Sequence, residues 1–103
     1  MPVDLTIPRE YKRRAEEALP GRMAEIVLFG SRARGDAHAE SDWDMAVFLN
    51  GLVGAAELDA LSDVGTSLLW DDSAVIETVP LATARNRDGT QLLRHIRRDG
   101  VSV

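Results

Sequence analysis

The chain has 103 residues, which is enough for one domain but too few for two independent cores. Its 45% hydrophobic and 28% charged residues are typical of a globular protein and exclude a disordered or fibrous chain. No apolar run approaches the roughly 20 residues of a membrane span, and the N-terminus lacks a signal-peptide core. We therefore expect a single domain over residues 1–103, a cytoplasmic location and no membrane partner.

The charged residues are unevenly distributed. The net charge is −5, and residues 36–77 contain ten acidic side chains and no Lys or Arg. The twelve basic side chains all lie in residues 1–35 and 78–103, so the acidic middle lacks the continuous basic face that binds duplex nucleic acid. It suits a chain that holds divalent cations at its centre and anions at its edges. The absence of cysteine excludes a disulfide framework and a thiolate metal site. A solvated helix face would account for five of the acids: Glu57, Asp59, Asp63, Asp71 and Asp72.

The first predicted element is a helix over residues 8–19. Pro8 is expected to begin it, and Pro20-Gly21 to end it. Apolar residues recur at spacings of three and four, at Ile7, Tyr11, Ala15 and Ala18. The outer face offers two ion pairs at i,i+4, namely Glu10 with Arg14 and Lys12 with Glu16.

Three apolar segments predict strands. Residues 24–30 form a short run closed by glycine, residues 42–50 form a second run, and residues 73–81 are rich in β-branched side chains. A short helix is expected to start at Ser31, directly after the first strand.

Two further helices are predicted in the second half of the chain. The helix over residues 54–71 has one face made of Leu58, Leu61, Gly65 and Leu68. The last helix begins with a capping box of Asp88 and Gln91 and stops at Gly100. It directs three apolar side chains inward: Leu92, Leu93 and Ile96. This order of elements predicts an α/β (α+β) fold with a small mixed β-sheet flanked by helices.

Two acidic residues interrupt the second apolar run. Alternate side chains of a strand share a face, so Asp42 and Asp44 should point the same way, with Trp43 and Met45 opposite. The two carboxylates then start roughly 6–7 Å apart, near enough to converge on metal ions. Their like charges repel unless a cation neutralises them, and carboxylate oxygens suit Mg²⁺ or Mn²⁺. An isolated D-x-D is nevertheless more often a loop cap beside a solvated acid.

The presence of Gly30-Ser31 before the aspartate pair favours a functional site over an isolated D-x-D. A glycine at the end of a strand lets backbone N–H groups and a hydroxyl approach a phosphate closely. Arg32 and Arg34 lie beside it and would neutralise phosphate charge, although exposure in a solvated turn is an equal alternative for each. No G-K-[ST] follows, so the segment is not a Walker motif. With the aspartate pair it predicts half of a triphosphate site.

The segment "GSRARGDAHAESDWDMAV" resembles the signature of the DNA polymerase β-type nucleotidyltransferase superfamily. The shared pattern is G-S, ten residues and D-x-D. The fuller form, G-S-x-A-x-G, five residues and S-D-x-D, is similar to that of the smallest members, the minimal nucleotidyltransferases. The ending "LLRHIRRDGVSV" likewise resembles the end of those short chains. The motif covers about a fifth of the chain, and the length and element order also fit.

The resemblance implies a polymerase β-type nucleotidyltransferase fold and metal-dependent nucleotidyl transfer. An NTP, with ATP as the leading candidate, would place its phosphates on Gly30 and Ser31. Asp42 and Asp44 would hold two Mg²⁺ ions, with Mn²⁺ as an alternative. An acceptor hydroxyl would attack the α-phosphorus and release pyrophosphate.

Such sites have a third carboxylate from a later strand, and Glu77 is the only acid in the third predicted strand. Its face would include Val75 and Val79, with Ile76 and Thr78 opposite. Relatives more commonly have aspartate here, and a slip of one residue would turn Glu77 away. The alternative for Glu77 is a solvent-facing side chain at a strand edge.

The resemblance also implies a partner. Relatives of this size are often encoded beside a HEPN-type toxin and can act as antitoxins by adenylylating it on a tyrosine. The alternative is a non-catalytic nucleotide- or partner-binding module that neutralises a toxin by complex formation. Self-association into a homo-oligomer stays open for so small a domain.

For four other residues we expect mainly structural roles. Tyr11 should pack one face of the first helix, and Trp43 and Trp70 should fill core or interface positions. Ser41 should steady the loop before Asp42 by bonding nearby backbone groups.

Overall fold

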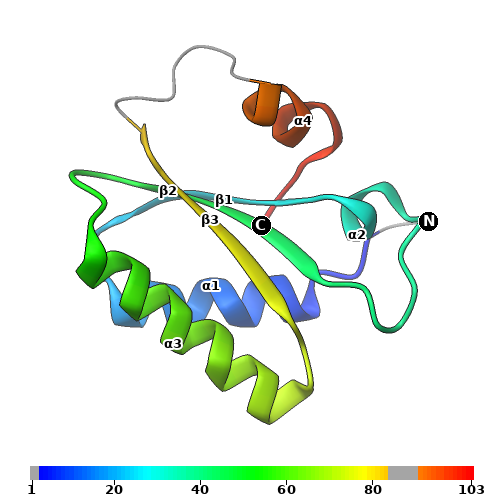
Figure 1. The fold of residues 1–103 in the computed structure, drawn as a ribbon, viewed down its shortest axis with the longest axis horizontal. Coiled ribbons are helices and arrows are strands. Elements are labelled where there is room, and N and C mark those ends of the chain that lie inside the picture. The colour runs from blue at the N-terminus through cyan, green and yellow to red at the C-terminus, as the bar shows by residue number, and fades with distance from the viewer. Residues whose placement is uncertain (1–2, 84–90) are drawn as a thin grey trace.

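The structure is a computed structural model that describes residues 3–83 and 91–103, apart from the side chain of Leu92. Within these residues the chain forms a four-stranded sheet with helices on both faces (Figure 1). The helices are α1 (Thr6–Ala18), α2 (Ser31–Arg34), α3 (Ala55–Asp72) and α4 (Gln91–Asp99). The strands are β1 (Met23–Phe29), β2 (Trp43–Leu49), β3 (Ile76–Ala82) and β4 (Val101–Ser102). The expected α/β fold with a small mixed sheet is confirmed.

The sheet has the strand order β3-β2-β1-β4. Strand β1 runs antiparallel to β2 and β4, whereas β2 and β3 are parallel and are joined through α3. The carboxyl end of β1 and the amino ends of β2 and β3 therefore meet at one end of the sheet, where α2 begins. The register at that end pairs Asp44 with Phe29 on one side and with Glu77 on the other.

Helices α1 and α3 cover one face of the sheet, below it in Figure 1. Trp43 lies in the core there with 8% of its surface exposed, as expected. Val64 is buried on α3, whereas the predicted face residue Leu58 is 49% exposed, because the buried stripe of α3 is centred on Leu61, Val64 and Leu68. Trp70 is 81% exposed, so of its two expected positions the core is wrong, and an interface position stays a prediction. The buried side chains of this core are Tyr11, Ala15, Ile26, Leu28, Trp43, Met45, Val47, Leu49, Leu61, Val64, Leu68 and Ala74.

Helix α4 covers the opposite face, above the sheet in Figure 1. Leu93 and Ile96 point inward as expected and pack with three side chains from β1 and β2: Val27, Ala46 and Phe48. Gly100 follows α4 at a place where a Cβ would collide with the Ile96 carbonyl oxygen and the Val27 side chain. The helix therefore ends at this glycine, as expected. The predicted capping residue Asp88 and the predicted inward side chain of Leu92 lie outside the described residues.

Local contacts explain where the element boundaries differ from the predicted ones. Helix α1 begins at Thr6, two residues before Pro8, because the Asp4 carboxylate accepts hydrogen bonds from the Thr6 N–H and hydroxyl at 2.9 and 2.7 Å. Ser73 ends α3 in the left-handed conformation, at φ 54°, so β3 begins only at Ile76. Strand β4 was not predicted, since two residues carry too short a pattern to recognise.

The predicted ion pairs of α1 have different outcomes. Glu10 and Arg14 form theirs at 2.7 Å, and Arg14 also reaches Asp71 of α3 at 2.9 Å. The expected pairing of Lys12 with Glu16 is wrong, because the Lys12 ammonium donates to the Val103 carbonyl at 3.1 Å instead. Asp71 is thus not simply part of a solvated face.

Glu57 is likewise not a simply solvated acid. Its carboxylate accepts the Gly54 N–H at 2.7 Å at the start of α3, and it pairs with Arg22 at 3.2 Å.

Across the described part of the chain, no helix has the length and apolar composition needed to cross a membrane.

Candidate active site

Asp42, Asp44 and Glu77 lie at the α2 end of the sheet. Asp44 is the second residue of β2 and is directly paired with Glu77 of β3, while Asp42 immediately precedes β2. Asp44 is half-buried, whereas Asp42 and Glu77 are exposed. The parallel register of β2 and β3 therefore brings an acid of the third predicted strand to the D-x-D pair. The register pairs Glu77 itself with Asp44, so the slip of one residue that would turn Glu77 away does not occur.

The electrostatics of Asp44 reflect this grouping. Burial raises the pKa of the Asp44 carboxyl above its ordinary value, and the negative charges of Glu77 and Asp42 raise it further, while Arg34 opposes them. Ionising Asp44 is therefore less favourable in the folded chain than in the unfolded chain. A bound cation would relieve this repulsion.

The three carboxylates have the chemistry of a site for a hard divalent cation. Mg²⁺ and Mn²⁺ prefer carboxylate oxygens, and Mg²⁺ retains several waters with only one or two protein carboxylates. Across residues 3–83 and 91–103, no three His, Asp or Glu side chains are drawn together tightly enough to hold a metal ion as they stand. Donor type and location thus fit a metal, and side-chain rotation would have to complete the coordination.

Gly30 is in contact with this acidic cluster. It follows β1 with φ 76° and ψ −158°, a conformation that side chains rarely adopt. A Cβ at Gly30 would overlap the Asp44 carboxylate oxygen and lie 3.1 Å from its Cγ. The first motif residue must therefore be glycine for two reasons: the positive φ and the close approach of Asp44.

Ser31 begins α2 directly after this glycine. The N–H groups of Ala33 and Arg34 donate to the Gly30 carbonyl at 3.1 and 3.0 Å. Those of Ser31 and Arg32 come earlier and have no acceptor within the helix. Gly35 closes the turn in the left-handed conformation, at φ 86°. The Gly-Ser turn therefore touches Asp44 through Gly30 and begins α2 with N–H groups that have no acceptor within the helix.

Arg34 is the motif arginine whose charge acts on Asp44. Its side chain is 46% exposed and pairs with Asp36 at 3.3 Å. Asp99 of α4 lies 4.0 Å away. Its positive charge lowers the pKa of Asp44, which places it within electrostatic reach of that carboxylate.

Arg32 is bound to the protein itself. Its guanidinium donates to the Ser41 carbonyl at 2.9 and 3.1 Å and to the Ala39 carbonyl at 3.2 Å. The same group stacks over the Trp43 ring, 4.0 Å from its centroid. The structure thus separates two arginines that looked equivalent in the sequence.

Ser41 takes the expected part in the loop before Asp42. Its hydroxyl accepts the His38 N–H at 3.0 Å, and its own N–H donates to the His38 carbonyl at 3.0 Å. These two bonds close the turn that leads into Asp42.

A hydrogen bond between α1 and the residue that follows Glu77 on β3 was not predicted. The fully buried Tyr11 hydroxyl lies 2.8 Å from the Thr78 hydroxyl, and burial raises the pKa of Tyr11 to about 12. Thr78 follows Glu77 on β3 and faces α1. The only signal in the sequence was that Tyr11 falls on the apolar face of the first helix, which indicated burial but not its partner.

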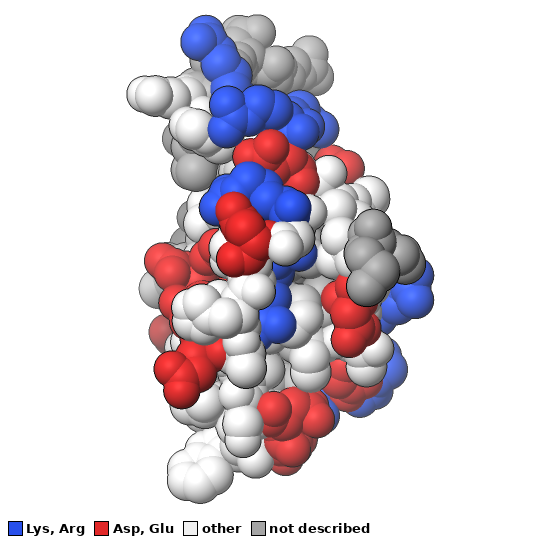
Figure 2. All heavy atoms as spheres, turned by 90° about the vertical axis from the view of Figure 1, so that its right-hand side faces the viewer, with Lys and Arg blue, Asp and Glu red and all other residues white. Residues whose placement is uncertain are grey.

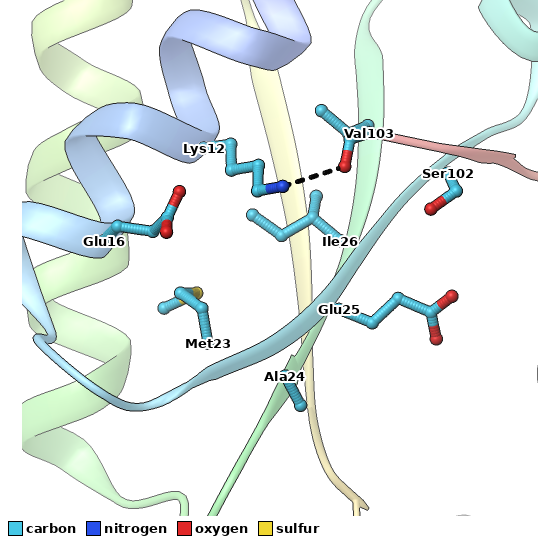
Figure 3. Close-up of a pocket in the computed structure, with 8 residues that line it drawn as sticks. All are labelled: Lys12, Glu16, Met23, Ala24, Glu25, Ile26, Ser102 and Val103. Atoms are coloured by element: carbon cyan, nitrogen blue, oxygen red, sulfur yellow. Dashed lines mark hydrogen bonds between the residues drawn. The ribbon is translucent and has the colours of Figure 1, made fainter.

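A hollow of about 240 Å³ beside the outer edge of β1 lies apart from this site (Figure 3). Lys12 crosses it to reach the Val103 carbonyl. None of the predicted site residues lines it, so we do not assign it to the active site. Its lining residues are Lys12, Glu16, Met23, Ala24, Glu25, Ile26, Ser102 and Val103.

Figure 2 faces the end of the molecule that carries α2. Basic side chains gather at its top, where α4 lies, and acidic side chains are scattered over the surface below, among uncharged and a few basic ones. Helix α4 carries Arg97 and Arg98 in its last turn, where cations are favoured by the helix dipole. The sheet end with the acids thus lies below a basic helix.

A mixed sheet with a Gly-Ser turn and carboxylates from two adjacent strands defines this chain as a nucleotidyltransferase-type protein. The chain belongs to the nucleotidyltransferase domain family, which its sequence matches over residues 8–96. It is 35% identical over 71 residues to MJ0604 of Methanocaldococcus jannaschii, a candidate protein adenylyltransferase. The match covers 69% of this chain and 66% of that protein.

Solved structures share the fold. A mutant MntA–HpeT toxin–antitoxin structure matches with a TM-score of 0.69 and 19% identity, over 91% of this chain and 69% of that one. A candidate nucleotidyltransferase of Sulfolobus solfataricus gives 0.65 and 21%, over 95% and 77%. A toxin–antitoxin structure with AMP-PNP gives 0.65 and 21%, over 89% and 68%. These likenesses confirm the fold that the sequence motif implied.

Proposed function

We propose that this chain transfers AMP from ATP to an acceptor hydroxyl in a reaction that depends on Mg²⁺. The observation that carries the proposal is the register that sets Asp44 against Gly30 on one side and Glu77 on the other. This arrangement joins an acidic cluster to a turn that can accept phosphate. The family match over residues 8–96 supports the same chemistry.

The nucleotide would be held by the Gly-Ser turn. The N–H groups at the start of α2 and the Ser31 hydroxyl would bind phosphate oxygens, since a phosphate can approach glycine backbone closely. Arg34 would supply positive charge from the side of Asp44, because its guanidinium already acts on that carboxylate. A toxin–antitoxin structure with the same fold contains AMP-PNP, which supports ATP as the substrate.

Asp42, Asp44 and Glu77 would hold Mg²⁺, most simply two ions, with Mn²⁺ as an alternative. The metal supplies neutralisation of phosphate charge and stabilisation of the attacking and leaving oxygens. Glu77 is exposed at the outer strand of the sheet, so an acceptor hydroxyl can approach it from solvent. Its carboxylate would assist removal of the proton from that hydroxyl.

The acceptor would be a tyrosine of a HEPN-type toxin, and the chain would then act as an antitoxin. Two similarities support this part of the proposal. MJ0604 is a candidate protein adenylyltransferase, and two of the structural neighbours are toxin–antitoxin complexes. The described residues form one small four-stranded sheet, so the chain would need its acceptor to complete the walls of the site.

A second candidate function is binding without turnover. In the described residues the three carboxylates are not drawn together into a metal site, and Arg32 is engaged by the protein itself. Both observations would suit a module that neutralises a toxin by complex formation alone.

The intact mass of the acceptor protein after incubation with this chain, ATP and Mg²⁺ separates the two functions. Transfer predicts the added mass of whole AMP groups, lost in Asp42→Ala/Asp44→Ala. The matched control is Asp59→Ala/Asp63→Ala, which removes the same charge from exposed positions of α3 and should leave transfer intact. Retained partner binding without added mass, with ATP, other NTPs or Mn²⁺, would favour the binding module.

A further inference from the structure

Arg32 bridges the two halves of the candidate site. It belongs to α2, directly after the Gly-Ser turn, yet its hydrogen bonds go to the loop before β2. The carbonyls that it binds belong to Ala39 and Ser41, and the ring under its guanidinium belongs to Trp43. Two of these contact points, Ser41 and Trp43, are the immediate neighbours of Asp42.

The contacts of Arg32 are extensive for a surface arginine. Nε and one Nη take part in three hydrogen bonds, and the flat face of the guanidinium lies on a ring that is only 8% exposed. Swinging the side chain towards a phosphate would break all of these contacts. Trp43 is itself part of the core formed with α1 and α3, so the arginine is anchored to a fixed surface.

Asp42 depends on its loop for its position. It precedes β2, is exposed, and has no ladder bond of the strand to fix it. The turn from His38 to Ser41 closes on itself through the bonds of Ser41, and Arg32 ties this turn to α2. The Trp43 N–H, bonded to the Val75 carbonyl at 2.8 Å, fixes the chain after Asp42, and Arg32 is the side chain that ties the loop before Asp42 to α2.

We infer that Arg32 is a positioning residue that holds Asp42 in place for metal binding, and not a ligand of the nucleotide. This inference rests on the proposed function, because it assigns Arg32 a task within that metal site. Groups that orient metal ligands commonly change metal affinity by about 10- to 100-fold when they are removed. Because Arg32 acts on the backbone beside Asp42, we expect the lower end of that range.

Arg22 provides a matched control at the other end of β2. It donates to the carbonyls of Asn50 and Leu52, at 2.6 and 2.5 Å, in the loop that follows the strand. Each arginine thus binds backbone carbonyls of one loop next to β2: Arg32 binds the loop before the strand, and Arg22 binds the loop after it. Only the loop held by Arg32 carries one of the acids of the candidate site.

The test compares Arg32→Met, Arg32→Lys and Arg22→Met with the wild-type chain. Calorimetry gives the affinity for Mn²⁺ without nucleotide and the affinity for ATP in excess EDTA, and thermal melting reports folding. We expect Arg32→Met to bind Mn²⁺ about tenfold more weakly while its metal-free ATP affinity is unchanged. Arg32→Lys, which keeps a single donor group, should fall between Arg32→Met and the wild type. Arg22→Met should melt at a lower temperature but keep the wild-type Mn²⁺ affinity.

Transfer assays complete the comparison. The Mg²⁺ concentration for half-maximal activity should rise in Arg32→Met and not in Arg22→Met. If Arg32→Met does not fold, Arg32→Lys carries the test, and wild-type Mn²⁺ affinity in that variant would overturn the inference.

Three other results would also overturn it. They are wild-type Mn²⁺ affinity in Arg32→Met, an equal loss in Arg22→Met, and a loss of metal-free ATP binding that exceeds the loss of Mn²⁺ binding. A wild-type chain that transfers no nucleotide, but whose Mn²⁺ affinity falls only in the Arg32 variants, would reject the proposed function and retain the positioning role. Failure of the wild type to bind Mn²⁺ would reject both.

Discussion

The Asp44 carboxylate occupies the space in which a side chain on Gly30 would lie. A Cβ at Gly30 would overlap its oxygen, and the glycine also has φ 76°. The glycine of the phosphate-binding turn and the acid of the metal-binding pair are therefore fitted to each other directly. This contact explains why the motif joins residues that lie fourteen positions apart in the sequence.

Gly30→Ala should destabilise the chain by about 1–3 kcal/mol, because it adds both backbone strain and overpacking. It should also abolish transfer, since Asp44 has to move. In Gly30→Ala/Asp44→Ala much of the overlap disappears, so part of the stability should return while transfer stays absent. Denaturant unfolding of the single and double variants measures this coupling. Strictly additive losses would show that the two residues do not compete for the same space.

Asp44→Asn should raise the melting temperature in metal-free buffer at neutral pH. The folded chain holds the Asp44 proton more tightly than the unfolded chain, because burial and the charges of Glu77 and Asp42 raise the pKa of Asp44. Stability therefore falls as the pH rises from the ordinary value of 3.8 through the pKa of the folded state, and stays lower above it. The advantage of Asp44→Asn should vanish below pH 3.8.

Excess Mg²⁺ should reverse this order, because it stabilises only a chain with the full acidic cluster. The control Asp59→Asn replaces an exposed acid of α3 and should change neither the metal-free melting temperature nor the response to Mg²⁺. A lower melting temperature of Asp44→Asn in metal-free buffer would contradict the repulsion that we describe.

Tyr11→Phe should cost about 1 kcal/mol of stability through the lost hydrogen bond to Thr78. The raised pKa of Tyr11, about 12, adds a test at alkaline pH. The unfolded chain loses the phenol proton near its ordinary value of 10, while the folded chain retains it, so stability should fall between pH 10 and about 12. This fall should be smaller in Tyr11→Phe. An identical pH dependence in both proteins would assign the alkaline loss to other groups.

The two tryptophans should respond differently to truncation. Trp43→Ala should destabilise the chain by about 3–5 kcal/mol, because its ring is buried between the core and Arg32. Trp70→Ala should change stability by less than about 0.5 kcal/mol, because 81% of Trp70 is exposed. Thermal unfolding of the two variants measures both values. A large loss in Trp70→Ala would mean that its surface is covered in solution, as self-association would cause.

The motif and most elements were accessible from the sequence because they depend on local spacing. Period-2 alternation placed Trp43 and Met45 on the face opposite the aspartates, and the spacing of Gly30, Ser31 and the aspartates indicated the family. The predicted inward positions of Leu93 and Ile96 follow from the same kind of periodicity. Leu58 was misplaced because apolar spacing along α3 allows several faces, and only packing against the sheet selects one.

What the sequence by itself determined was therefore the kind of fold, the family and the positions of the D-x-D and Gly-Ser residues, all of which are set by short-range patterns. Only the tertiary structure decided that Glu77 pairs with Asp44 and that Arg32 binds a loop while the charge of Arg34 acts on Asp44. The strand pairing that aligns Glu77 joins residues more than thirty positions apart, and such a register depends on packing across the sheet. The division between the arginines depends on which side chain meets the Trp43 ring and the carbonyls of the folded loop, contacts that exist only after β1 and β2 have paired.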